Sequence, residues 1–219
     1  MVPYEQSLQR AMGEVRDSRH FDVVYEQLGP GGPGKDPTGI FELMAEDGFP
    51  LAPRLKESYF PYRYMALEWR TANPGTALVG EFQIYNIDAG TEECLRPLED
   101  FSRDHRGKEL LSQLRIFDDL SRTGHGRLAT LRLYPGVTNP EIWFLDKSHP
   151  AVRLDLDYRA YLDNLILTKG TLGWQYLFAD VDREYIHVLE DVATMLRIFP
   201  GLFPDYDYAP LISRLEARL

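Results

Sequence analysis

Residues 126–165, GRLATLRLYPGVTNPEIWFLDKSHPAVRLDLDYRAYLDNL, decide the fold. Three short runs within them, 126–135, 141–146 and 151–156, have the length and the branched and aromatic content of β-strands. The links between the runs, GVTN and KSHP, consist largely of turn-forming residues. Links this short permit only antiparallel pairing, so the stretch predicts a β-meander.

The sequence on either side of the meander has helical spacing of its apolar residues. Asp157 is a suitable N-cap, and the helix it predicts is carried by Tyr158, Tyr161, Leu162, Leu165 and Ile166. Alternation predicts one more strand at 76–87. Further helices are predicted at 4–19, 37–47, 50–62, 107–121, 182–199 and 209–219. We therefore expect an α+β fold, with a central antiparallel sheet flanked by helices and with extra helices at the C-terminus.

Residues 29–36, GPGGPGKD, are one residue short of a nucleotide-binding P-loop. Asp36 stands where the motif needs Ser or Thr, and two prolines remove backbone N–H groups that would cradle a phosphate. The stretch is better explained as a linker, with Asp36 capping the helix behind it. It divides the chain into an N-terminal helical piece, 1–28, and a single α+β domain, 37–219.

The charge of the chain restricts its partners. Of 219 residues, 44% are hydrophobic, which is typical of a globular protein, and 34 acidic against 24 basic residues give a formal net charge of −10. Because nucleic acids and anionic membranes repel such a chain, we expect no nucleic acid and no membrane as partner, and a basic protein partner is favoured. General solubility is the alternative explanation of the same charge.

The compartment follows from cysteine usage and from hydropathy. Cys94 is the single cysteine, so no internal disulfide can form, and a reducing cytoplasm is the simplest location. The N-terminus lacks the apolar centre of a signal peptide, and no run of about 18 apolar residues occurs. The sequence therefore predicts a cytoplasmic protein.

The same meander carries a resemblance to a known family. Its hairpin strands, the strand Ile142–Asp146 and the helix that begins at Asp157 resemble the second half of the SMI1/KNR4 (SUKH) superfamily. Upstream, FPLAPRLKESYFPYRYMALEW is similar to a family helix, with Leu55, Tyr59 and Phe60 in the matching places. The likeness covers residues 40–170. It implies a binding module without catalytic residues, often an immunity protein that neutralises a bacterial toxin.

Two stretches are candidates for the partner contact. Aromatic and arginine side chains, which dominate interface hot spots, crowd a segment that contains Tyr59, Tyr62, Arg63 and Trp69. A core layer under the sheet is the alternative explanation. Acidic residues around Cys94, including Glu92 and Glu93, form a second candidate surface that would face a basic toxin, and a solvated loop explains them equally well.

Two other classes of function remain open. A hydrolase would use a carboxylate such as Asp155, which is near Asp157 in sequence, together with His125 or His149. A small-ligand module would line a pocket with Trp69, Trp143 and Trp174. No cofactor or metal is predicted, since the histidines lack ligand spacing. Trp143 and Asp155 are counted as binding candidates, and the oligomeric state is left open.

Overall fold

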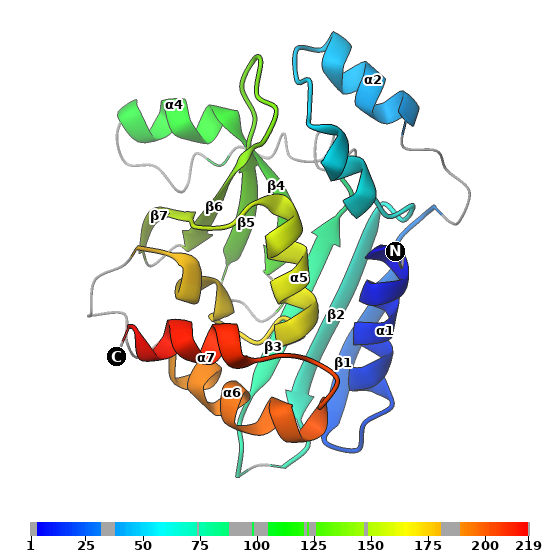
Figure 1. Ribbon diagram of the computed structural model, residues 1–219, viewed down its shortest axis with the longest axis vertical. Helices are drawn as coiled ribbons and strands as arrows, with labels where there is room; N and C mark the ends of the chain where they lie inside the picture. The colour runs from blue at the N-terminus through cyan, green and yellow to red at the C-terminus, as the bar shows by residue number, and fades with distance from the viewer. Residues whose placement is uncertain are drawn as a thin grey trace.

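The computed structural model describes residues 4–31, 38–73, 75–87, 98, 105–120, 122, 126–146, 149–180 and 189–218. Its centre is a seven-stranded antiparallel sheet in which the strands lie side by side in chain order (Figure 1). The strands are β1 (Phe21–Leu28), β2 (Tyr64–Thr71), β3 (Val79–Tyr85), β4 (Leu114–Leu120), β5 (Arg127–Arg132), β6 (Glu141–Asp146) and β7 (His149–Leu154). The predicted α+β class is confirmed.

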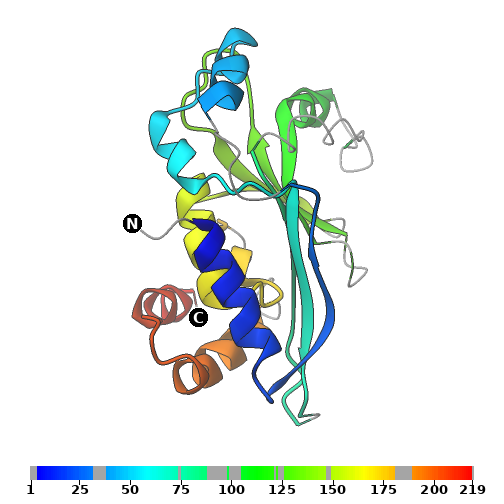
Figure 2. The ribbon, with the colours of Figure 1, turned by 90° about the vertical axis from the view of Figure 1, so that its right-hand side faces the viewer.

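Helices cover the sheet unequally on its two faces. They are α1 (Tyr4–Arg16), α2 (Thr38–Glu46), α4 (His105–Gln113), α5 (Tyr158–Thr168), α6 (Glu190–Leu202) and α7 (Ala209–Glu216), with the 3-10 helices η1 (Pro53–Ser58) and η3 (Trp174–Phe178). Figures 1 and 2 show α1, α5, α6 and α7 on one face of the sheet and α4 on the other. Helix α2 projects beyond one end of the sheet.

The main core lies between the sheet and α5. Phe117 of β4 meets Tyr161 of α5 edge-on at 4.7 Å between ring centroids, and Tyr161 lies 4.8 Å from the Trp174 ring. A smaller apolar cluster on the opposite face, under α4, consists of Leu98, Leu111, Leu114, Ile116, Leu128 and Leu145. Burying aromatic rings of this size is the largest single favourable contribution to such a fold.

The predicted antiparallel meander is confirmed, with β7 beginning two residues earlier than the predicted strand 151–156. Trp143 of β6 pairs with Thr130 of β5 on one side and with Arg153 of β7 on the other. Asp157 caps α5 as predicted, because its carboxylate accepts a hydrogen bond from the Ala160 amide at 2.9 Å. The helix then ends at Lys169, whose left-handed φ of 53° closes its last turn.

The N-terminal piece is part of the same core. Helix α1 buries Leu8, Met12 and Val15 in the main apolar cluster. Residues 21–28 form β1, an edge strand that the sequence analysis did not predict. Its alternation is interrupted by a bulge between Val23 and Tyr25, which hides the strand period.

The helix predicted at 107–121 is wrong in its second half. Helix α4 ends at Gln113, and the chain continues directly as β4. A bulge between Ile116 and Asp118 shifts the alternation by one residue, so that Leu114 and Ile116 join the small cluster while Phe117 and Leu120 join the main one. Apolar residues spaced in this way imitate the period of a helix.

The segment after α2 also differs from its prediction. The expected short helix at 50–62 is reduced to the 3-10 helix η1, and the following residues form β2, which was not predicted. Met65, Ala66 and Leu67 are all buried, so this strand, which lies next to the edge strand β1, is covered on both faces here and shows no polar–apolar alternation. For the helix predicted at 182–199, residues 181–188 lie outside the described part, and α6 covers the rest.

The junction between β3 and β4 divides the sheet into two parts. Strands β2 and β3 pair through seven residues, and β4 and β5 through six. Between β3 and β4, the described residues give one registered pair, Ile84 with Asp118. We call this junction the seam.

Candidate functional site

Helix α2 is held mainly by two buried residues and ends at a glycine. Phe41 and Met44 are buried in the main cluster. Gly48, at φ 92°, donates to the Ala45 carbonyl, and the Phe49 amide donates to the Met44 carbonyl at 2.8 Å. These two bonds form a Schellman motif, which ends the helix where the sequence predicted its stop.

The opposite side of α2 is exposed and acidic. Glu42, Leu43, Glu46 and Asp47 are all exposed, and their spacing of three and four residues places them on one face. Leu43 is 62% exposed, the highest value among the large apolar residues of the described chain. None of the three acids forms an ion pair with a described residue. Because no ion pair with the described residues offsets their charge, this face has a negative potential around an apolar centre.

The loop between β5 and β6, residues 133–140, lies beside α2 in both ribbon views (Figures 1 and 2). The Gly136 amide donates to the Gly48 carbonyl at 2.8 Å, and the Ala52 amide donates to the Thr138 carbonyl at 2.8 Å. Tyr134 of this loop is 39% exposed. We call the exposed face of α2 together with this loop the apical surface.

Three basic side chains of the described residues near the apical surface are already engaged. Arg54 lies 3.5 Å from the Asp157 carboxylate, and Arg132 lies 3.1 Å from Glu141. The Lys56 ammonium lies 5.5 Å from the centre of the Phe41 ring, over which it makes a cation–π contact. With respect to the described residues, the acids of α2 therefore remain available to a cation from outside the chain.

The predicted aromatic and arginine segment lies between this surface and the sheet. Tyr59 and Tyr62 are half-buried and pack against the main cluster, and the Tyr62 hydroxyl accepts a hydrogen bond from Gln9 at 3.4 Å. Arg63 is half-buried and its amide donates to the Pro30 carbonyl at 2.8 Å. These three residues mainly hold the segment in place, as the core alternative predicted.

The three tryptophans do not share a pocket. Trp69 is 1% exposed, and its indole N–H donates to the Lys169 carbonyl at 2.7 Å, so the prediction that it contacts a partner is wrong. Trp174 is also buried in the main core. Trp143 packs against the small cluster on the other face and donates to Glu141 at 3.1 Å.

Asp155 lines a shallow groove beside the start of α5. Its side chain is 81% exposed and lies 3.0 Å from Arg214. The groove, of 380 Å³, is also lined by Glu141, Arg153 and Asp157 among others. Each of its acids has an arginine partner within 3.5 Å. His125 and the side chain of His149 lie outside the described residues, so the hydrolase alternative stays a prediction.

Glu92, Glu93 and the linker residues 32–37, with Asp36, also lie outside the described residues. The acidic surface expected around Cys94 and the cap by Asp36 therefore stay predictions. The acidic surface that the structure does describe, on α2, was missed. Its signal in the sequence is a leucine flanked by acids on the side of the helix away from Phe41 and Met44.

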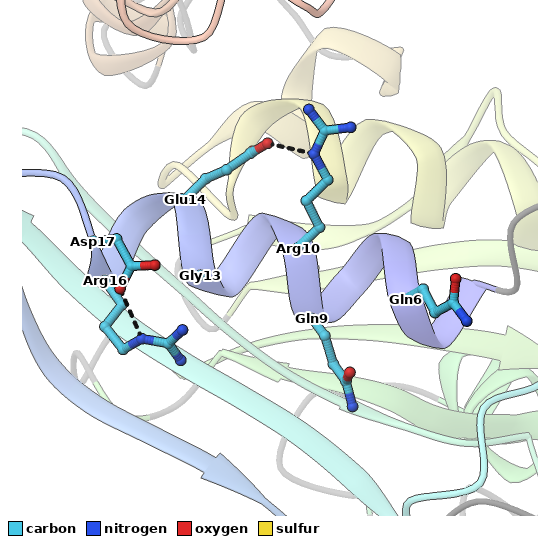
Figure 3. A pocket seen from close by; sticks show the side chains of 7 residues that line it. All are labelled: Gln6, Gln9, Arg10, Gly13, Glu14, Arg16 and Asp17. Atoms are coloured by element: carbon cyan, nitrogen blue, oxygen red, sulfur yellow. Dashed lines mark hydrogen bonds and ion pairs between the residues drawn. The ribbon is translucent and has the colours of Figure 1, made fainter.

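A second hollow, of 580 Å³, follows the outer side of α1 (Figure 3). Two ion pairs line it, Arg10 with Glu14 at 2.9 Å and Arg16 with Asp17 at 3.1 Å. Glu14 also accepts from the buried Lys169 ammonium at 2.7 Å. Because its charges are matched internally, this hollow offers less attraction to a charged partner than the apical surface does.

One carboxyl is fully buried beneath α5. Asp118 accepts hydrogen bonds from the Gln83 amide at 2.9 Å and from the Tyr161 hydroxyl at 2.8 Å. Burial raises its pKa from the usual 3.8 to about 8, and the nearby Asp119 and Glu81 act in the same direction. A perturbed pKa of this kind marks either a functional group or a structural one. Asp118 lines neither of the two hollows described above and is fully buried, so a structural role fits better.

Within the described ranges, no group of three potential metal ligands comes together, and no helix combines the length and apolarity that a membrane crossing needs. Comparisons of this chain with protein-family models, with characterised proteins and with solved structures give no match.

Proposed function

We propose that this chain is a non-enzymatic protein-binding module that docks a basic protein partner through the apical surface. The observation that carries the proposal is the exposed face of α2, where Leu43 stands among three acids without ion-pair partners in the described chain. Exposed leucines are common singly. Here the leucine coincides with charged neighbours and a projecting helix, an arrangement that could supply the apolar centre and the polar rim of a protein interface.

The two kinds of side chain have different roles in this proposal. The carboxylates of Glu42, Glu46 and Asp47 attract a basic surface over a distance of about 10 Å at ordinary ionic strength, and they speed the encounter. Leu43 and Tyr134 then lose their contact with water and slow dissociation. The partner therefore has a cationic surface with an apolar depression in it.

The finer part of the proposal is that the module acts in the cytoplasm as an immunity protein. Its support is the resemblance of residues 40–170 to the SUKH superfamily, together with the formal charge of −10. In this account the module neutralises a basic bacterial toxin by covering its working surface, and no bond is made or broken. Such a role requires only a rigid surface of the opposite charge.

The test is a pull-down from the native cell lysate with three forms of the tagged chain, at low and at high salt, with mass spectrometry of the retained proteins. The forms are the wild type, the triple variant Glu42→Lys, Glu46→Lys, Asp47→Lys, and the matched triple variant Asp180→Lys, Glu190→Lys, Glu216→Lys. The last three acids are exposed and lie away from the apical surface. Each triple variant replaces three acids by lysines, so both variants have the same net charge.

We expect a basic protein that the wild type and the matched variant retain at low salt, that high salt releases, and that the α2 variant fails to retain. Lysines near the C-terminal end of a helix suit its dipole, so the α2 variant should still fold. Equal retention by the two triple variants would refute docking at the apical surface. A bait that retains nothing at low salt would refute the binding function.

A further inference from the structure

The apical surface is built from both parts of the divided sheet. Helix α2 belongs to the connection between β1 and β2, on one side of the seam. The loop with Tyr134 joins β5 to β6, on the other side. The relative position of the two parts of the surface therefore depends on the direct bonds from Gly136 to Gly48 and from Ala52 to Thr138, and on how firmly β3 is held to β4.

The Asp118 side chain supplies bonds that the sparse ladder at the seam lacks. One carboxyl oxygen accepts a hydrogen bond from the backbone amide of Gln83 of β3, in place of a backbone carbonyl. The other oxygen accepts a hydrogen bond from the Tyr161 hydroxyl of α5. The Tyr161 hydroxyl in turn accepts a hydrogen bond from the side-chain amide of Gln175 of η3 at 3.3 Å. Asp118 is 0% exposed. One side chain thus joins both parts of the sheet to the helix that covers them.

The charged groups that face Asp118 do not favour its ionised form. Asp119 on its own strand and Glu81 on β3 are acids, and Tyr158 and Tyr161 from α5 have raised pKa values, chiefly because they are buried. Gln175 of η3 is neutral. Burial and the two acids outweigh the hydrogen bonds from Tyr161 and Gln83, which lower the pKa of Asp118. A neutral carboxyl can keep both bonds, since it can accept from Gln83 and donate to Tyr161.

We propose that the Asp118 carboxyl acts as a proton-controlled clasp across the β3–β4 seam, which keeps the two parts of the apical surface aligned while it is neutral and loosens as it ionises. The effect on binding rests on the function proposed above. The clasp itself is a property of the chain alone and can be measured without a partner.

The direction of the pH effect follows from proton linkage. In the closed seam the pKa of Asp118 is about 8, whereas in an opened seam water reaches the carboxyl and the pKa returns towards 3.8. The open form then binds fewer protons than the closed form throughout this window. The equilibrium share of the open form rises by up to about tenfold for each pH unit and levels off above the closed-form pKa of about 8. Acid therefore tightens the seam and alkali loosens it.

The experiment is amide hydrogen exchange at Gln83, followed by NMR from pH 5 to pH 9 and corrected for the intrinsic exchange rate. We expect its protection factor to fall by up to about tenfold per pH unit up to pH 8, then to level off. In Asp118→Asn it should stay flat, because the side-chain amide accepts from Gln83 and donates to Tyr161 without titrating. Asp119→Asn is the matched control and should keep the slope.

Global unfolding also exposes Asp118, so the opening constant at Gln83 is compared with the unfolding constant measured in urea at each pH. The clasp predicts a larger opening constant than unfolding constant. Equality of the two, or a pH-independent protection factor in the wild type, would overturn the proposal. These comparisons use the wild type, so they hold even if Asp118→Asn does not fold.

The link to binding is tested with the basic protein retained in the pull-down. Its affinity for the wild type should fall between pH 6 and pH 8 more steeply than its affinity for Asp118→Asn. Parallel affinity profiles, with a pH-dependent Gln83 amide, would overturn the coupling to the apical surface. A pull-down that retains nothing counts against the proposed function and leaves the Gln83 result to decide on the clasp.

Discussion

Helices α2 and α5 have similar lengths, nine and eleven residues, but opposite uses in the molecule. Helix α5 buries Tyr158, Tyr161, Leu162, Leu165, Ile166 and Thr168 between the sheet and the other helices. Helix α2 buries Phe41 and Met44 alone. The first is a scaffold on which the fold depends. The second is attached mainly by these two side chains, with Ile40 packing beside them, and its opposite face is exposed.

Their charged side chains differ in the same way. On α5, Asp157 lies 3.5 Å from Arg54, Arg159 lies 2.8 Å from Glu57, and Asp163 accepts from the Tyr4 hydroxyl at 2.5 Å. On α2, the acids have no such partners in the described chain. From this difference we expect substitutions on α5 to change stability, and substitutions on the exposed face of α2 to change binding.

The largest effect is expected beneath α5, at Asp118. Its raised pKa means that its contribution to stability is fully present below pH 3.8 and is lost as pH rises to about 8. The loss amounts to ~6 kcal/mol over that window. Asp118→Asn removes this titration, so the variant should gain stability relative to the wild type from pH 4 to pH 8. Urea unfolding of both proteins at several pH values measures the difference, and parallel curves would contradict it.

The next effect is expected at the C-terminal end of α5. Lys169 is fully buried there, and burial lowers its pKa to about 8 even though the bond to Glu14 opposes this. Glu14→Gln leaves the ammonium without its counter-charge, at a cost of about 3–5 kcal/mol in unfolding free energy. The double variant Glu14→Gln, Lys169→Met should recover much of this loss. A double variant whose loss of stability equals the sum of the two single losses would contradict this prediction.

Truncation in the middle of α5 should cost less. Leu162 is fully buried, and Leu162→Ala should lower the unfolding free energy by about 3 kcal/mol through lost burial and a residual cavity. Thermal or urea unfolding measures it. A loss below about 1 kcal/mol would mean that α5 is not the scaffold described here.

The cap of α5 contributes a smaller amount. Asp157→Ala removes the bond to the Ala160 amide and should cost about 1 kcal/mol. Asp157→Asn retains an acceptor and serves as the control. Its salt bridge to Arg54 is half-exposed and long, so we expect little from it. Equal losses in the two variants would assign the effect to charge instead of to capping.

The smallest effect on stability is expected on α2. Leu43→Ala should change the unfolding free energy by less than about 0.5 kcal/mol, because the side chain is already exposed. Its effect should appear in binding, as a loss of affinity of about tenfold for the retained partner, because the proposal makes Leu43 the apolar anchor at the centre of the interface, and a few such anchors carry most of the binding energy. Met44→Ala, on the buried side, should reverse the pattern and lower stability first.

The local features of this fold could be predicted from the sequence, and the long-range ones could not. The meander at 126–156 and the cap at Asp157 depend on neighbours in the chain, so periodicity and turn residues identify them. Strands β1 and β4 contain bulges, and β2 is covered on both faces, so none of the three shows a regular alternation. Their pairing partners, which the sequence does not display, decide their conformation.

The candidate site was predictable to a smaller extent. The sequence indicated a basic partner from overall charge, and aromatic content drew attention to Trp69, which the tertiary fold buries. Exposure depends on what the rest of the chain covers. The apical surface requires the contact between Gly48 and Gly136, which are far apart in sequence, and no local pattern encodes it.

The most direct test of the account is a hydrogen-exchange footprint of the wild-type chain with and without its retained basic partner, read segment by segment. We predict slower exchange in residues 38–52 and 133–140 on binding, with α5 unchanged. Protection along α1 or β1, with the apical surface unaffected, would contradict the proposal that this chain binds its partner through α2.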